Sequence, residues 1–401
     1  MTILKPPHED SKGIIVFTHK ERKFMVRGDV LDEIMRNIKE NYFISMHWGY
    51  YQPKPIQRIP YVDFHFAREK TVKFDYDTIR IPLVAYNFNP SYFEPLDIPK
   101  KYDLLTISTP QYRKRLTDLL ETIRSLFDDG IKIKVLIWVP RDRVLTGPNA
   151  DHDFYTYYEK LFNQSEKKLV QIHSPVRFEE TYPLPHTIMP YLYNSSRLFA
   201  LFSDIEGDPR VINESLLCGV PVLARKGLLG SGLDYVNGSN SELFVDNSDA
   251  AAKIKYMLAN IKGYEFDASK LRHELVADQS IYELVGKLRS IYEQFGCEFK
   301  GPLYTEKLSM ALPSHTSRLP NTISKNTTDD LNNIYSFLRY CNMISDHDFS
   351  GYNVTDYWRV GFNHIMERPD RFLKDSTLSL LMRIENKTGI NLSQVYDVVS
   401  K

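Results

Sequence analysis

Between residues 102 and 261, short apolar segments alternate with longer segments in which apolar residues recur at helical spacing. Uninterrupted apolar runs are typical of strands buried on both faces of a sheet, and such strands joined by helices form parallel sheets. This pattern predicts a doubly wound α/β sheet. The predicted strands are Tyr102–Ser108, Ile131–Val139, Leu169–His173, Leu198–Ser203 and Val220–Ala224, and the predicted helices are Arg113–Phe127, Thr187–Arg197, Pro209–Cys218 and Asp249–Ile261.

The residues before this region predict a second, shorter α/β unit. Strands are expected at Gly13–Thr18, Tyr42–Met46 and Ile81–Tyr86, with a helix over Asp29–Ile38. Pro90, Pro95 and Pro99 indicate a linker between the two units.

A long helical region, Ala268–Phe295, ends the second unit, and the polar, proline-bearing segment Pro302–Thr328 follows it. We therefore expect three parts. Residues 1–95 form a short α/β domain, residues 96–300 form a Rossmann-type domain, and residues 301–401 form a linker and a helical C-terminal appendage.

The charge and cysteine content limit the classes of partner and the compartment. Lys and Arg together number 51, as do Asp and Glu, so no overall field attracts nucleic acid. Three scattered cysteines are typical of a reducing, cytoplasmic protein. No apolar run approaches the ~18 residues of a transmembrane helix, and the N-terminus does not have the pattern of a signal peptide. Peripheral membrane contact stays open.

The segment Leu198–Leu223, LFALFSDIEGDPRVINESLLCGVPVL, carries the chemistry. A predicted strand ends at Ser203, and Asp208-Pro209 has the form of an N-cap followed by the first helical residue. Ligands of open α/β sheets bind where strands end and helices begin. We therefore expect Glu206 in the binding turn and Glu214 in the helix after it.

The two glutamates, eight positions apart and followed by Leu-Leu-Cys-Gly-Val-Pro-Val, resemble the E-x7-E signature of GT-B glycosyltransferases, especially glycosyltransferase family four. The resemblance covers about residues 96–300 and is specific around residues 190–224. It implies that residues 96–300 are the donor-binding domain and residues 1–95 the acceptor-side domain. It also implies that Glu206 contacts the donor sugar and that Glu214 accepts hydrogen bonds from the ribose. It also places Gly207, Pro209 and Arg210 at the donor. The family commonly has Gly-x-Gly here, whereas this chain has Gly207-Asp208-Pro209.

Arg113 and Lys114 open the first predicted helix of the same domain. Cations do not suit the N-terminus of a helix, whose dipole favours anions, but they would suit an anion bound there. The family resemblance places donor-diphosphate cations at this point, and Arg115 is an alternative to either residue. A solvated basic helix start is the alternative explanation of Arg113 and Lys114, and an i,i+4 pair with Arg210 is the alternative for Glu214. We favour the binding role for all three residues.

The same resemblance implies a histidine that faces the donor sugar from the first domain. His19, His47 and His65 all lie near predicted strands, and we take His65 and His47 as the candidates. A satisfied structural histidine is the simpler interpretation of each. The usual glycine-rich first loop is replaced by the charged segment His19–Arg27.

The sequence therefore predicts a GT-B-like architecture, with two Rossmann-type domains facing a cleft. The resemblance implies transfer of a sugar from a nucleotide diphosphate sugar to a glycan, lipid-linked or other hydroxyl acceptor, with retention and without a cofactor or a metal. Asp-x-Asp triplets begin at Asp75, Asp151 and Asp346, and none follows a clear strand of the donor domain. The alternatives are a non-catalytic nucleotide-sugar or glycan-binding protein, a partner-dependent subunit, or an epimerase on the same fold.

Overall fold

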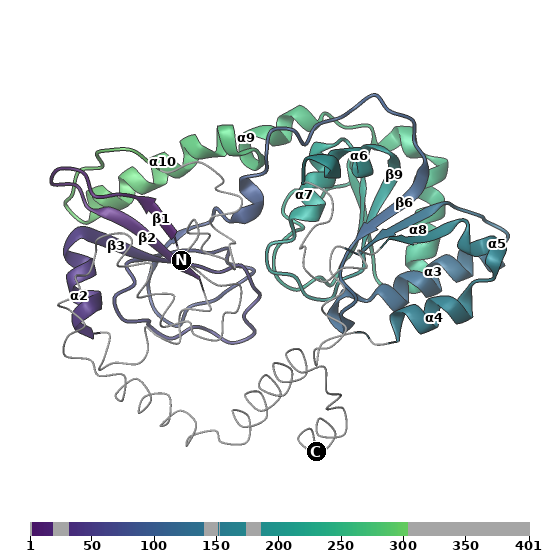
Figure 1. The fold of residues 1–401 in the computed structure, drawn as a ribbon, viewed down its shortest axis with the longest axis horizontal. Coiled ribbons are helices and arrows are strands. Elements are labelled where there is room, and N and C mark those ends of the chain that lie inside the picture. The colour runs from purple at the N-terminus through teal and green to yellow at the C-terminus, as the bar shows by residue number, and fades with distance from the viewer. Residues whose placement is uncertain (1, 19–31, 140–150, 152, 174–185, 304–401) are drawn as a thin grey trace, which may run out of the picture. The chain divides into compact units, whose positions relative to one another are not determined.

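The structure is a computed structural model, and it describes residues 2–18, 32–139, 151, 153–173 and 186–303. The predicted appendage beyond residue 303, His19 and the triplet at Asp346 lie outside the described residues. Within them are two β-sheets (Figure 1). No helix of the described part is long and apolar enough to cross a membrane.

The larger sheet has six strands in the order β11-β10-β9-β6-β7-β8, all parallel. From β6 the chain winds outward through β7 to β8, and then returns to the other side of β6 as β9 and continues to β11. This is the strand order of the doubly wound Rossmann fold, as predicted. The strands are β6 (Tyr102–Ile107), β7 (Val135–Trp138), β8 (Val170–His173), β9 (Ser196–Leu201), β10 (Val222–Arg225) and β11 (Ser241–Phe244).

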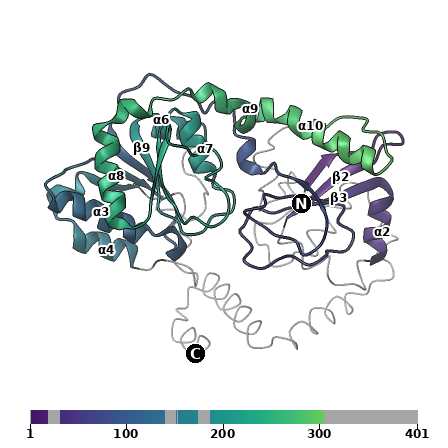
Figure 2. The ribbon, with the colours of Figure 1, turned by 180° about the vertical axis from the view of Figure 1, so that it is seen from behind.

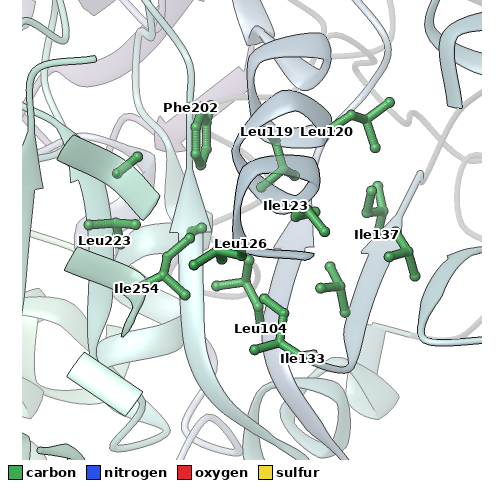
Figure 3. Packing of buried hydrophobic residues seen from close by; sticks show 14 of the residues in the cluster. Leu104, Leu119, Leu120, Ile123, Leu126, Ile133, Ile137, Phe202, Leu223 and Ile254 are labelled. Carbon is green, nitrogen blue, oxygen red and sulfur yellow. The ribbon is translucent and has the colours of Figure 1, made fainter. Parts of the chain in front are cut away.

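Both faces of this sheet are covered, because alternate residues of most of its strands enter different cores. Leu104 packs with α3, α4 and α8, whereas its neighbour Leu105 packs with α6, α7 and α9. Figure 3 shows Leu119, Ile123 and other residues of α3 in the first of these cores. The helices are α3 (Leu116–Asp128), α4 (Phe154–Leu161), α5 (Gln164–Lys167), α6 (Met189–Asn194), α7 (Arg210–Leu217), α8 (Asn247–Ala259) and α9 (Arg272–Leu275).

The smaller sheet has the order β1-β2-β3-β4-β5, in which β1 is antiparallel to β2 and the other neighbours are parallel. Its strands are β1 (Thr2–Lys5), β2 (Gly13–Thr18), β3 (Tyr42–His47), β4 (Phe64–Phe66) and β5 (Ile79–Ile81), with α2 (Asp32–Asn41) between β2 and β3.

Helix α10 (Ala277–Gln294) packs on this smaller sheet, where Leu284, Leu288 and Tyr292 join the core that contains Ile14 and Phe64 (Figures 1 and 2). The sequence analysis placed these helical residues with the donor domain. The helix therefore ties the end of residues 96–300 to the first sheet, and the division at residue 95 stays a prediction.

Several predicted boundaries are wrong for local reasons. The predicted strand Ile81–Tyr86 ends at Ile81, because Pro82 has no N–H for the ladder, and a 3-10 turn, η1 (Ala85–Asn87), follows. The predicted helix Ala268–Phe295 is broken at Val276. Its backbone is extended there and forms a bridge with Asn89 of the linker.

Two corrections affect the predicted site. The helix expected at Arg113 begins only at Leu116, because Arg115 has a left-handed backbone with φ 51°, and Arg113 and Lys114 lie in the preceding 3-10 turn η2 (Tyr112–Lys114). The cap of α7 is Pro209, not Asp208, and the Asp208 side chain does not cap the helix. Arg113, Lys114 and Asp208 therefore do not lie at a helix end as predicted.

Candidate active site

The candidate site lies at the point where the winding of the larger sheet reverses. β6 and β9 are neighbours, and the chain leaves them toward opposite edges, so the turns after them flank a crevice at the carboxyl end of the sheet. The two turns are joined directly. The Asp204 N–H donates to the Arg113 carbonyl at 2.8 Å, and Arg113 Nη1 donates to the Ile205 carbonyl at 3.0 Å.

Glu206 joins the two predicted diphosphate cations. Lys114 Nζ donates to Glu206 Oε1, and Arg113 Nη1 lies 3.7 Å from Oε2. The Glu206 side chain is only 7% exposed, so this carboxylate needs cationic partners. Burial lowers the pKa of Lys114, an effect that the neighbouring Glu206 opposes and Arg113 reinforces. A buried lysine beside an arginine would be stabilised further by a bound anion.

A cavity of about 200 Å³ opens beside this cluster. Of the predicted site residues, the structure brings five to its wall: His47, Arg113, Glu206, Gly207 and Arg210. The remaining wall consists of Thr18, Gly49, Tyr50, Ala85 and Asp208. Residues of both sheets therefore contribute to one cavity, at the end of β2 and β3 and at the turn after β9.

Asp208 lines the cavity but is not among the predicted site residues. Its Oδ2 lies 3.3 Å from His47 Nε2, and both side chains are almost completely buried. Neither atom has a hydrogen-bond partner of acceptable geometry. The other carboxylate oxygen, Oδ1, lies 3.2 Å from Ser231 Oγ. The sequence does not indicate this role, because Asp208 followed by Pro209 predicts a helix cap.

A glycine-rich segment, residues 229–232, holds the turn that contains Glu206. The Glu206 N–H donates to the Leu229 carbonyl at 2.9 Å, and the Ser231 N–H donates to the Gly207 carbonyl at 3.3 Å. Gly230 has φ 98°, and a Cβ there would lie 1.8 Å from the Glu206 carbonyl oxygen. Only glycine fits this close approach. The sequence signal for this support is the Gly-Ser-Gly triplet at residues 230–232, which is not among the predicted site features.

Gly207 lies in close contact with the segment that follows β3. A Cβ on Gly207 would lie 1.9 Å from the carbonyl oxygen of Gly49, which follows β3. The absence of a side chain at Gly207 thus lets the segment after β3 pack directly on the turn, and this contact encloses one side of the cavity.

Glu214 and Pro209 are not part of the cavity wall. The Glu214 side chain is buried and accepts a hydrogen bond of 2.8 Å from the Tyr193 hydroxyl. Tyr92 lies near enough for the Glu214 charge to contribute, after burial, to raising the pKa of Tyr92 to about 12. Pro209 caps α7 and touches Gly232 instead of facing the cavity. The ribose role of Glu214 stays a prediction.

His65, the other candidate histidine, lies within the first sheet. Trp48 Nε1 donates to its Nδ1 at 3.1 Å, and its Nε2 lies 2.9 Å from the Tyr76 hydroxyl. Its ring also stacks on Phe74. Since Nδ1 is the acceptor, the neutral ring carries its proton on Nε2 and donates to Tyr76. Burial, with a smaller contribution from Arg80, lowers the pKa of His65 to about 3. The structure therefore brings His47, and not His65, to the cavity.

No group of three or more His, Cys, Asp or Glu residues in the described ranges is arranged to hold a metal ion. Of the triplets, Asp75 begins one near β5, and Asp151 is buried while its neighbour His152 lies outside the described residues. The resemblance to glycosyltransferase family four also implies that residues 173–176 flank the nucleobase, and of these only His173 lies within the described residues.

Comparison with known proteins identifies the fold. No protein-family model and no curated protein matches the sequence. Among solved structures, the chain is similar to TarM, with 16% identity and a TM-score of 0.50 over 71% of this chain and 55% of TarM. It is also similar to a glycosyltransferase from Rickettsia africae ESF-5, with 14% identity and a TM-score of 0.49 over 70% and 77% of the two chains. A third is the pneumococcal O-GlcNAc transferase GtfA, with 11% identity and a TM-score of 0.48 over 64% and 54%.

The chain spans about half the length of TarM and of GtfA. Identities this low establish the fold and nothing finer. The two sheets, the strand order and the similarity to TarM together define an α/β protein of the GT-B glycosyltransferase fold with two Rossmann-like domains.

Proposed function

We propose that the chain is a cytoplasmic glycosyltransferase that moves a sugar from a nucleotide diphosphate sugar to a glycan, lipid-linked or other hydroxyl acceptor. One observation carries the proposal. Arg113, Lys114 and Glu206 meet beside a cavity at the switch point of a Rossmann sheet. Two cations and one carboxylate in such a place suit a leaving diphosphate and a sugar that becomes positively charged as its bond breaks.

In the proposed reaction, the bond between the anomeric carbon and the diphosphate oxygen breaks and a bond to the acceptor oxygen forms. Arg113 and Lys114 hold the diphosphate and stabilise its growing negative charge. Glu206 stands beside the anomeric carbon, where its carboxylate stabilises the oxocarbenium-like sugar. The acceptor proton moves to the departing diphosphate, which suits transfer with retention. The resemblance to glycosyltransferase family four implies this outcome, and it implies that no metal or cofactor is needed.

Calorimetric titration with nucleoside diphosphates, namely UDP, GDP, ADP, CDP and dTDP, tests the binding half of the proposal. Replacing both Arg113 and Lys114 with Ala should weaken the best ligand more than tenfold, since charge-assisted hydrogen bonds are each worth ~1.5–3 kcal/mol.

The chain offers a matched control for this double variant. Arg124 and Lys132 also share one carboxylate, that of Glu166, at 2.9 and 3.1 Å, and neither lines the cavity. Replacing Arg124 and Lys132 with Ala removes the same two residue types and should leave the affinity unchanged. Equal affinities in both double variants would remove Arg113 and Lys114 from the site.

A purely nucleotide-sugar-binding protein would also pass the titration. Release of nucleoside diphosphate from a nucleotide sugar by the purified protein separates the enzyme from the binding protein, and analysis of the sugar product separates a transferase from an epimerase.

A further inference from the structure

The cavity contains one buried pair of polar groups that the proposed reaction does not use. Asp208 Oδ2 and His47 Nε2 are 3.3 Å apart, and their side chains are 5% and 2% exposed. Neither atom makes a hydrogen bond within the protein, although both lie at the cavity wall. Burying polar atoms without partners is costly, so the geometry indicates that a ligand supplies the partner.

A single hydroxyl group satisfies both atoms. It can donate its proton to the Asp208 carboxylate and accept a proton from His47 Nε2, because a hydroxyl is both a donor and an acceptor. A carboxylate satisfies neither requirement well, since it has no proton to donate and repels Asp208. We propose that Asp208, beside the histidine that the family resemblance already places at the donor sugar, recognises a hydroxyl of the transferred sugar and excludes sugars that carry a carboxylate there. This inference rests on the proposed function.

The charges around the cavity favour the same selection. Glu206 pairs with Arg113 and Lys114 beside the cavity, and the diphosphate of the donor would bring further negative charge there. An anionic sugar would add another negative charge close to the buried Asp208 carboxylate, where charges interact more strongly than in water. The cavity should therefore bind neutral sugars in preference to uronic acids.

The backbone around Asp208 keeps its carboxylate at the cavity. Gly207 packs against Gly49, and Ser231 approaches both the Gly207 carbonyl and Asp208 Oδ1. The residue after Asp208 is a proline, whose fixed φ restricts the turn. Asp208 is thus held from both sides, while Oδ2 is left to face His47.

The test uses donor pairs that share a nucleotide and differ only in the sugar charge: UDP-glucose against UDP-glucuronic acid, and GDP-mannose against GDP-mannuronic acid. For the accepted base, the wild type should turn over or bind the neutral donor at least about a hundredfold better than the anionic one. Asp208→Asn keeps the size of the side chain and removes its charge. It should reduce that preference at least tenfold, which corresponds to ~1.4 kcal/mol.

The ratio between the two donors is the decisive readout, because any general weakening of the site affects both donors alike. His47→Gln should lower turnover of the neutral donor more than that of the anionic donor. Asp128→Asn is the control, since Asp128 is 65% exposed, pairs only with Arg124 among the described ion pairs and does not line the cavity. It should leave the ratio unchanged.

The outcomes separate the two claims. If the wild type binds no nucleoside diphosphate and no donor, the proposed function fails. If it binds them, but Asp208→Asn leaves the neutral-to-anionic ratio within about twofold of the wild type, the proposed function stands and the recognition role of Asp208 is overturned.

Discussion

The pairing of Glu206 with Lys114 leads to an unusual prediction for Glu206→Gln. Lys114, which a diphosphate would contact, donates a hydrogen bond to the Glu206 carboxylate. The second cation, Arg113, is 3.7 Å from the same carboxylate. Removing the carboxylate charge therefore frees both cations for the ligand and removes a repulsion from it. We expect Glu206→Gln to bind the nucleoside diphosphate more tightly than the wild type, and yet to turn over its donor more slowly.

The magnitudes follow from the distances. Two unit charges ~4 Å apart interact by ~1 kcal/mol in water and ~4 kcal/mol at an effective dielectric constant of ~20. A gain in affinity of about tenfold, or ~1.4 kcal/mol, is the conservative estimate. Loss of a positioned charge at the reacting carbon should lower kcat by ~10²-fold or more. The free energy of unfolding should fall by ~3 kcal/mol, because a buried pair loses one partner.

Titration calorimetry gives the affinity, initial rates at saturating donor give kcat, and urea unfolding gives the stability. Glu166→Gln is the matched control, because Glu166 also binds one arginine and one lysine but does not line the cavity. It should leave both the affinity and kcat unchanged. If Glu206→Gln binds the nucleoside diphosphate more weakly than the wild type, the diphosphate does not lie on Lys114 and the reasoning fails.

Three further predictions concern other parts of the site and its support. Glu214→Ala should raise the KM for the donor with little change in kcat, whereas Tyr193→Phe should chiefly cost ~1–3 kcal/mol of stability in urea unfolding; unchanged kinetics in Glu214→Ala would exclude the ribose role. Gly207→Ala should lower both Tm and activity because its Cβ meets the Gly49 carbonyl, and Gly227→Ala, where no atom lies within 4 Å, should change neither; a fully active Gly207→Ala would contradict the close contact. The neutral ring of His65 contributes stability that is fully present above pH 6.5 and is lost as the pH falls toward its folded pKa of about 3. The free energy of unfolding should therefore fall by ~2 kcal/mol between pH 6.5 and pH 5, as measured by urea unfolding at each pH. His65→Gln should flatten that slope, and an equally steep slope in the variant would refute the assignment.

The sequence predicted the larger sheet well, because its strands are continuous apolar runs separated by helical periodicity. It missed β11 and the precise ends of several elements, since those depend on tertiary contacts. Arg115 adopts a left-handed backbone that no local pattern indicates, and the extended conformation at Val276 depends on pairing with Asn89. Local propensity predicts neither the backbone conformation of Arg115 nor the pairing of Val276.

The candidate site was predictable where residue type and topology agree. Arg113 and Glu206 follow strands that are neighbours in a doubly wound sheet, so their meeting could be inferred. The choice of His47 over His65 could not be, because both follow or lie in buried strands. Only the packed structure shows that Trp48 and Tyr76 use both nitrogens of His65.

Asp208 shows how a local rule can conceal a functional residue. Asp followed by Pro is a common start of a helix, and a cap was the simplest interpretation of the pair. In the structure the cap is Pro209, and the Asp208 carboxylate faces a histidine from the other sheet. A contact between residues 161 positions apart has no signature in a single sequence.

The central claim is that this chain transfers sugar from a nucleotide diphosphate donor, and the most direct measurement is release of nucleoside diphosphate from a panel of nucleotide sugars by the purified protein. The account predicts that one donor is consumed, that Glu206→Gln and the Arg113 and Lys114 double variant lose that turnover, and that the Arg124 and Lys132 double variant keeps it. A wild-type protein that releases no nucleoside diphosphate from any donor in the panel, or one whose turnover survives the loss of Glu206, Arg113 and Lys114, would contradict it.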